Sequence, residues 1–103
     1  MELTGRALVG TVRSAEPLAG ARTPAYVLEV DFGEAGRKRS SAQITDLYTA
    51  EDLIGSQVVA LVDLVAKRIA GVVSECLVLG VQTPEGVVVL RPERAVQNGA
   101  EIF

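Results

Sequence analysis

Alternating side chains between residues 26 and 32 limit the fold of this chain more than any other feature of its sequence. One face of this segment carries the side chains of Tyr26, Leu28, Val30 and Phe32. The opposite face carries the carboxylates of Glu29 and Asp31. A period of two is typical of a half-buried antiparallel strand with its apolar face in the core.

A second strand should pair with this one. Residues 33–36, Gly-Glu-Ala-Gly, supply a turn, so residues 37–44 are predicted to return alongside and close a hairpin. The polar face of the returning strand would carry Arg37, Arg39, Ser41 and Gln43.

The core of the protein must be built mainly from aliphatic side chains. Hydrophobic residues make up 49% of the 103-residue chain, but aromatic residues make up only 4%. Valine, isoleucine and leucine favour strands when they cluster and alternate. A chain of this length forms one domain, residues 1–103, and buries enough surface to fold without a disulfide or a metal. We therefore expect a single all-β domain.

Further strands are predicted on both sides of the hairpin, at residues 3–12, 57–64, 76–81, 87–90 and 100–103. Loops or turns are predicted at residues 16–20, 67–71, 83–86 and 98–99. Thr49 stands three residues before Asp52, a capping-box pattern, and Gly55 ends the short helix that this pattern predicts. With one short helix between the third and fourth strands, this order predicts a five-stranded OB-fold Greek-key barrel with extra terminal strands. A sandwich is the alternative that we favour less.

Two of the predicted strands, residues 76–81 and 87–90, are apolar on both faces. A barrel wall with solvent outside needs only one apolar face, so either loops or a second subunit must cover the other face. Few residues remain to act as a cover. We therefore expect a homodimer that buries this outer surface.

The sequence lacks the residue types on which most enzyme and metal sites depend. It contains no histidine and a single cysteine, Cys76, which lies inside an apolar run. We expect this thiol to be buried and inert, and we expect no metal, no cofactor and no enzymatic activity. One unpaired cysteine fits a reducing compartment, and no signal peptide or apolar span of about 18 residues is evident. These features predict a cytoplasmic protein without membrane insertion.

Basic residues gather in places, although the net charge of -3 argues against indiscriminate binding of nucleic acid. Arg37, Lys38 and Arg39 are consecutive, and Lys67 adjoins Arg68. The second and third strands of an OB barrel and their loops form its usual ligand face, for which oligonucleotides are typical ligands. The basic triplet therefore predicts phosphate contacts. The alternative is a solvated strand edge that prevents aggregation.

Two segments of the chain resemble the signature segments of a known family. They are Ser-Ser-Ala-Gln-Ile at residues 40–44 and Lys-Arg-Ile-Ala-Gly-Val-Val-Ser-Glu-Cys-Leu at residues 67–77. Both are similar to those of the tRNA-binding domain family, the OB-fold modules appended to some methionyl- and phenylalanyl-tRNA synthetases. Residues 21–26, 30–33 and 40–45 also resemble the free-standing CsaA-type proteins. That resemblance implies a homodimeric protein-export chaperone that binds unfolded or precursor polypeptides.

The resemblance also implies positions for a nucleic-acid surface. Matched residue by residue, the family's surface falls on Ser40, Ser41, Gln43, Lys67, Arg68, Ser74 and Glu75, beside the basic triplet of Arg37, Lys38 and Arg39. Asp63 departs from the family pattern, which commonly has asparagine at this strand end. A carboxylate repels phosphate and so weakens the expectation of tight tRNA binding, or else it pairs with Lys67 or Arg68 and holds the turn.

Three functions follow from these features. The first is a CsaA-like homodimeric, export-related chaperone for unfolded or precursor polypeptides. The second is a tRNA- or single-stranded nucleic-acid-binding module. The third is a dimerisation domain without a ligand of its own.

Overall fold

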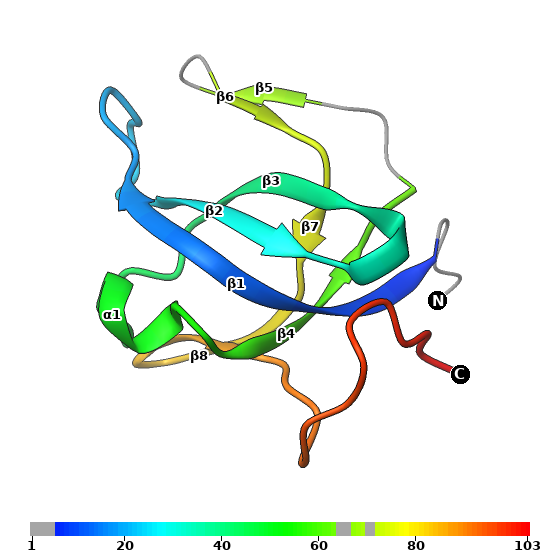
Figure 1. Ribbon diagram of the computed structural model, residues 1–103. Coiled ribbons are helices and arrows are strands. Elements are labelled where there is room, and N and C mark those ends of the chain that lie inside the picture. The colour runs from blue at the N-terminus through cyan, green and yellow to red at the C-terminus, as the bar shows by residue number, and fades with distance from the viewer. Residues whose placement is uncertain (1–5, 64–66, 70–71) are drawn as a thin grey trace.

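The computed structural model describes residues 6–63, 67–69 and 72–103, and at residues 67–69 and 72 it describes the backbone. Figure 1 shows a rounded, mostly β molecule in which one short helix lies at the end of the barrel. The strands are β1 Ala7–Pro17, β2 Tyr26–Asp31, β3 Arg37–Ala42, β4 Gln57–Leu61, β5 Lys67–Ile69, β6 Val72–Ser74, β7 Leu77–Val78, β8 Gly80–Thr83 and β9 Gly86–Val89. The helices are the single 3-10 turn η1 Gly33–Ala35 and α1 Ala50–Leu53.

Five strands form the central sheet, in the order β3-β2-β1-β4-β7. Every neighbouring pair in this sheet is antiparallel. The sheet coils until β7 comes near β3, so the barrel is nearly closed (Figure 1). Because four antiparallel steps separate these two strands, β3 and β7 run in the same direction. The prediction of an OB-like barrel with a helix between its third and fourth strands is confirmed.

The first strand is longer than predicted and serves two neighbours. Its first half pairs with β4 and its second half pairs with β2, with a register shift between Val12 and Ser14. This bulge bends the strand, and Val12 and Ala15 are both buried although they lie three positions apart. The predicted loop at residues 16–20 is wrong at its start, because Glu16 and Pro17 still pair with β2. The predicted start at residue 3 lies outside the described residues.

The predicted core faces are confirmed. Leu28, Val30 and Phe32 are fully buried, and Tyr26 is half-buried against them. The Tyr26 hydroxyl donates a hydrogen bond of 2.8 Å to the Tyr48 carbonyl, so its polar end has a partner inside the protein. On β4 the side chains of Val58 and Ala60 face inward, as does Val62 just beyond it. The rest of the predicted strand end, at Leu64, lies outside the described residues.

The helix between β3 and β4 begins with the predicted capping box. The Thr49 hydroxyl accepts from the Asp52 amide at 3.2 Å, and the Asp52 carboxylate accepts from the Thr49 amide at 3.0 Å. Gly55 follows at a φ of 87°, a left-handed conformation that favours glycine after a helix end. Local sequence alone therefore determines both ends of this element.

Two predicted segments are wrong in their limits. Residues 67–71 do not form one turn, because residues 67–69 are strand β5 and pair with β6. The run at residues 76–81 breaks at Leu79, whose amide donates to the Val59 carbonyl while its own carbonyl accepts from the Leu90 amide. The chain leaves the barrel at this point, and β8 and β9 form a separate hairpin with the predicted turn between them.

The last predicted strand, at residues 100–103, is reduced to a single bridge between Leu8 and Glu101. Residues 99–102 instead run alongside the first half of β1, on the edge that does not pair with β4. The Val9 amide donates to the Ala100 carbonyl, and the Gly99 amide donates to the Val9 carbonyl. The predicted turn at Asn98 and Gly99 is confirmed. Within the described part of the chain, no helix is long and apolar enough to cross a membrane.

Candidate ligand-binding surface

Two segments that carry predicted site residues meet along one edge of β3. The Ser74 hydroxyl lies 3.0 Å from both the Ser41 amide and the Ser41 hydroxyl. The Arg39 amide donates to the Glu75 carboxylate at 3.1 Å, and the Glu75 amide donates to the Arg39 carbonyl at 2.8 Å. Residues more than 30 positions apart in the chain are therefore side by side. In this arrangement Ser74 and Glu75 join β6 to β3.

Ser40 is a predicted site residue that does not lie on this surface. Ser40 is fully buried, and its hydroxyl donates to the Ser41 carbonyl at 3.3 Å. Strand alternation explains this position, because Ser41 faces outward and its neighbour must face the core. Cys76 lies nearby, and burial raises the pKa of its thiol to about 12. The prediction that this cysteine is buried is confirmed.

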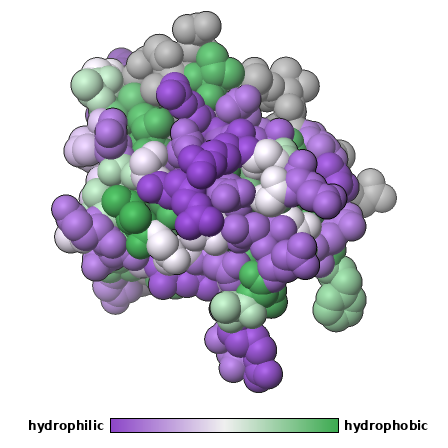
Figure 2. Space-filling model, in the orientation of Figure 1, coloured by the Kyte–Doolittle hydropathy of each residue, from purple (hydrophilic) through white to green (hydrophobic). Residues whose placement is uncertain are grey.

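The outer face of β2 and β3 carries charges of both signs. Figure 2 shows that the centre of this face is hydrophilic, with hydrophobic residues gathered nearer its margins. Arg37 forms an ion pair of 3.0 Å with Glu29, and Arg13 forms one of 3.3 Å with Asp31. The pKa of Asp31 is lowered, first by a hydrogen bond from the Gly33 amide and then by Arg13. A phosphate that reached Arg37 would therefore compete with a carboxylate.

The middle residue of the basic triplet faces a different direction. Lys38 is half-buried on the core side of β3, opposite Val30. Its charge acts on Asp63, whose pKa is lowered mainly by a hydrogen bond from Arg6. Arg6 and Asp63 form an exposed ion pair of 2.9 Å. Arg6 is thus a partner of Asp63 that the sequence did not indicate, while a pair with Lys67 or Arg68 lies outside the described residues.

The remaining predicted residues are exposed or are described by their backbone. Arg39 on β3 and Gln43 just beyond its end are both exposed. Arg39 lines a shallow depression of about 310 Å³ together with Ser14, Glu16, Val27 and Glu29. Lys67 and Arg68 lie on β5, opposite Ser74 and Val73 of β6. The fold thus brings the β5–β6 hairpin to the edge of β3.

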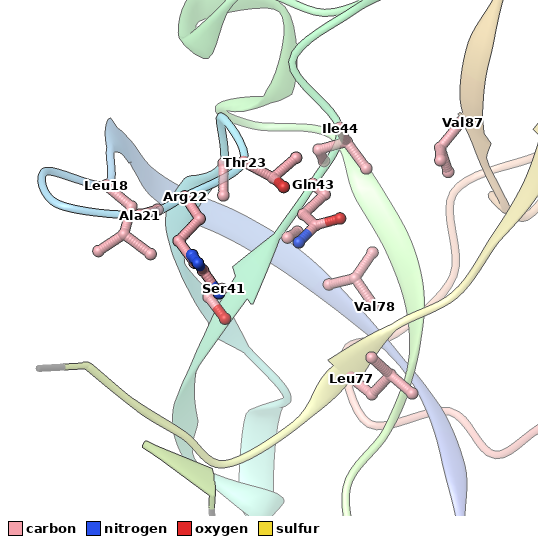
Figure 3. A pocket seen from close by; sticks show the side chains of 12 residues that line it. Leu18, Ala21, Arg22, Thr23, Ser41, Gln43, Ile44, Leu77, Val78 and Val87 are labelled. Carbon is pink, nitrogen blue, oxygen red and sulfur yellow. The ribbon is translucent and has the colours of Figure 1, made fainter. Parts of the chain in front are cut away.

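An open groove of about 540 Å³ lies where β3 ends, between the β1–β2 loop and β7. Its lining is mostly apolar and consists of Leu18, Ala21, Arg22, Thr23, Ala25, Ser41, Ala42, Gln43, Ile44, Leu77, Val78 and Val87. Figure 3 shows Gln43 between Ser41 on one side and Leu77 and Val78 on the other, with Arg22 extending from the loop in the direction of Ser41. Leu77 remains 47% exposed. The groove therefore offers an accessible apolar surface.

Sequence reasoning located only part of this groove. Ser41 and Gln43 were expected on a ligand face, but Arg22, Leu77 and Val78 were not. The groove forms because the β1–β2 loop folds back over the end of β3, held by a hydrogen bond from the Leu18 amide to the Ala25 carbonyl. In the sequence, the resemblance at residues 21–26 pointed to this loop but did not assign it a function.

A second apolar surface lies on the β8–β9 hairpin. Val81 pairs with Val88 across the two strands, and these side chains are 51% and 40% exposed. Leu79 and Leu90 lie two positions further along the same face, and Leu90 is 40% exposed. We call these four residues the hairpin face. The expectation that the runs at residues 76–81 and 87–90 present apolar side chains outward as well as inward is confirmed.

Comparison with known proteins assigns the family. The model of the family described as "Putative tRNA binding domain" matches residues 8–101. A solved structure of chaperone CsaA from Bacillus anthracis is 52% identical, with a TM-score of 0.89 over 95% of this chain and 90% of that chain. The CsaA chaperone protein of Picrophilus torridus is 38% identical, with a TM-score of 0.91 over 95% and 91% of the two chains.

A longer enzyme is also similar. The methionine–tRNA ligase of Methanococcoides burtonii is 33% identical over 92 residues, which cover 88% of this chain but only 13% of the ligase. The similarity thus concerns a small part of that enzyme. Because the family model spans nearly the whole chain and the barrel agrees with the two CsaA structures, this protein belongs to the tRNA-binding domain family.

Proposed function

We propose that this chain is a CsaA-like homodimeric chaperone that binds unfolded or precursor polypeptides in the cytoplasm, in connection with protein export. The observation that carries the proposal is the open groove with its apolar lining. The similarity to two proteins named as chaperones over nine-tenths of their length supports it. A polypeptide that has not folded exposes the apolar side chains that such a groove accepts.

The chemistry of the groove favours a polypeptide over a nucleic acid. Among the residues that the structure describes, its lining contains aliphatic side chains and no aromatic ring, whereas single-stranded nucleic acid is usually held by bases stacked on aromatic side chains. Arg22 supplies one cation at the rim. One cation contributes little to the phosphate neutralisation on which nucleic-acid affinity depends.

The test is suppression of aggregation when a chemically denatured protein is diluted into buffer. Wild-type protein should reduce light scattering at equimolar dimer. Leu77→Asp places a charge in the groove and should abolish most of this effect. Ile54→Asp is the matched control, because Ile54 is equally exposed at 48% but lies after α1, away from the groove. A wild-type protein without effect, or two variants that behave alike, would contradict the proposal.

A second candidate is binding of tRNA or single-stranded nucleic acid, which the family assignment and the methionine–tRNA ligase relatives favour. Within the described part of the chain, Arg39 is exposed without an ion pair. It lies near the strand pair that carries Lys67 and Arg68. We propose Arg37, Lys38, Arg39, Lys67 and Arg68 as the phosphate contacts, with Ser41 and Gln43 toward the bases and Ser74 and Glu75 holding the edge.

Salt dependence distinguishes the two candidates. Phosphate contacts require the logarithm of affinity to fall steeply as the logarithm of salt concentration rises. A variant that neutralises Arg37, Lys38, Lys67 and Arg68 should lose tRNA binding but keep aggregation suppression. Arg94→Gln is the control, because Arg94 pairs with the adjacent Glu93 on the exposed C-terminal segment. No tRNA binding by wild-type protein at about 50 mM salt would dismiss the second candidate.

A further inference from the structure

The barrel has a seam between β3 and β7 that no backbone ladder closes in the described part of the chain. At one end of the seam, the Ser74 hydroxyl and the Glu75 carboxylate accept from the amides of β3. The amides of Glu75 and Cys76 both donate to the Arg39 carbonyl there. Beyond Ser41 these contacts stop and the groove begins. Side-chain and backbone hydrogen bonds therefore close one end of the seam, and the other end is open.

Backbone N–H and C=O groups alternate in direction along a strand, so some of those on β3 and β7 point into the open part of the seam. On β3 the amides of Arg39 and Ser41 point toward β6 and β7. Gln43 follows directly after the end of β3 with the same parity, so we infer that its N–H and C=O lie on that edge. On β7 the alternation is fixed by Leu79, whose amide donates to Val59 of β4. Val78 precedes it and therefore points its N–H and C=O away from β4, into the groove.

These groups are available to a ligand. Within the part of the chain that the structure describes, the backbone N–H and C=O of Gln43 have no hydrogen-bond partner. The Val78 side chain lines the groove beside them. Unpaired backbone groups of an extended strand form a template for another extended chain. The apolar lining would take the side chains of that chain that face the barrel.

We propose that the groove is a slot for an added strand, in which an extended polypeptide segment hydrogen-bonds to the backbone of Gln43 and packs against the Val78 side chain. This inference rests on the proposed chaperone function and names its binding mode. Main-chain hydrogen bonds do not depend on the ligand's sequence, so the mode suits a protein that binds many unfolded chains.

Charge restricts the sequence of the occupant. Arg22 is the charged residue of the lining and stands on the loop at the rim. It is exposed and has no ion pair within the described residues. An opposite charge on the ligand complements it and a like charge is repelled. The occupant that fits is therefore an extended segment of alternating apolar residues with a glutamate or aspartate beside them.

The first test compares two labelled peptides with wild-type protein by fluorescence anisotropy. Both are seven-residue peptides of alternating valine and threonine with one glutamate, and the second is N-methylated on alternate backbone amides. Loss of two main-chain hydrogen bonds should weaken binding by about tenfold or more. Equal affinity for both peptides would overturn the strand slot but leave polypeptide capture standing. If neither peptide binds and aggregation is not suppressed, the proposed function fails as well.

The second test acts on the protein. Gln43→Pro removes the backbone donor and should weaken the unmethylated peptide by about tenfold, while Gln43→Ala keeps that donor and should bind like wild type. Thermal unfolding checks that both variants fold. If Gln43→Pro does not fold, the comparison with the N-methylated peptide still tests the proposal. Arg22→Glu should reverse the preference between the glutamate peptide and its lysine counterpart. An unchanged preference would overturn the role of Arg22.

A second copy of the chain is the competing occupant of the slot. If a copy filled it, the peptide would displace that copy and the sedimenting mass would fall by half. We expect the mass to be unchanged when the unmethylated peptide saturates the protein. A halved mass would overturn the proposal and assign the seam to the dimer interface.

Discussion

Asp31 shows how one carboxylate connects local geometry to stability. Its pKa is lowered because the folded chain supplies the Gly33 amide and then Arg13 as partners. A carboxyl group whose pKa is lowered by folding stabilises the folded state at pH values above its unfolded pKa, which is 3.8. That contribution is lost as the pH falls through the lower folded value.

We therefore expect Asp31→Asn to reduce the free energy of unfolding at neutral pH, with a difference from wild type that shrinks as the pH falls below about 4. Urea unfolding between about pH 6 and pH 2 measures it. Glu85→Gln, in the exposed β8–β9 turn, is the control and should follow wild type. A difference that does not change with pH would contradict this account.

Cys76 is protected by its surroundings. Burial raises the pKa of its thiol to about 12, and the sulfur lies 3.7 Å from the Arg39 carbonyl. The reactive thiolate is therefore scarce at neutral pH. We expect Cys76 to react with a thiol reagent only in denaturant. Ile54→Cys adds a thiol at a position that is 48% exposed and should react at once in the folded protein. Immediate labelling of wild-type protein would show that this environment opens in solution.

At the scale of the element, β1 depends on one glycine where it crosses β2. A Cβ atom at Gly10 would lie 2.6 Å from a methyl carbon of Val30 and 2.8 Å from the ring of Phe32. Real Cβ atoms do not approach so closely, so the core must shift. The strand needs glycine here for space, since its φ is not in the left-handed region.

We expect Gly10→Ala to lower the free energy of unfolding by about 1–3 kcal/mol through overpacking. In a Val30→Ala background the same change should cost less, because the nearest methyl group is gone. Urea unfolding of the four proteins forms a double-mutant cycle. Strictly additive costs would argue against the contact between Gly10 and Val30.

For the whole molecule, the hairpin face is the surface that a second subunit would cover. Val81 and Val88 are exposed, apolar and opposite each other. A double substitution, Val81→Asp and Val88→Asp, should convert the proposed dimer to a monomer because it buries two carboxylates at the interface. Sedimentation at micromolar concentration measures the mass. Ile54→Asp should remain dimeric, and a wild-type monomer at this concentration would contradict the dimer.

The elements that the sequence predicted well are those determined by neighbouring residues. Alternation at residues 26–32 gave the buried side of β2, and the capping box gave both ends of α1. The limits of β1 and of the run at residues 76–81 were wrong. In both cases the partner strand decided the outcome, since β1 continues as long as β2 pairs with it and Leu79 turns away from the barrel toward Leu90.

The sequence by itself determined the family, the all-β class and the residues that face the core, because periodicity, turns and caps act over a few positions. Only the tertiary structure decided which polar residues share a surface. It buried Ser40, paired Arg37 with Glu29, and used Ser74 and Glu75 to close one end of the seam. It also made the groove, whose walls come from a loop, β3 and β7. These contacts join residues tens of positions apart, so they arise only when the sheet coils and β7 returns to β3.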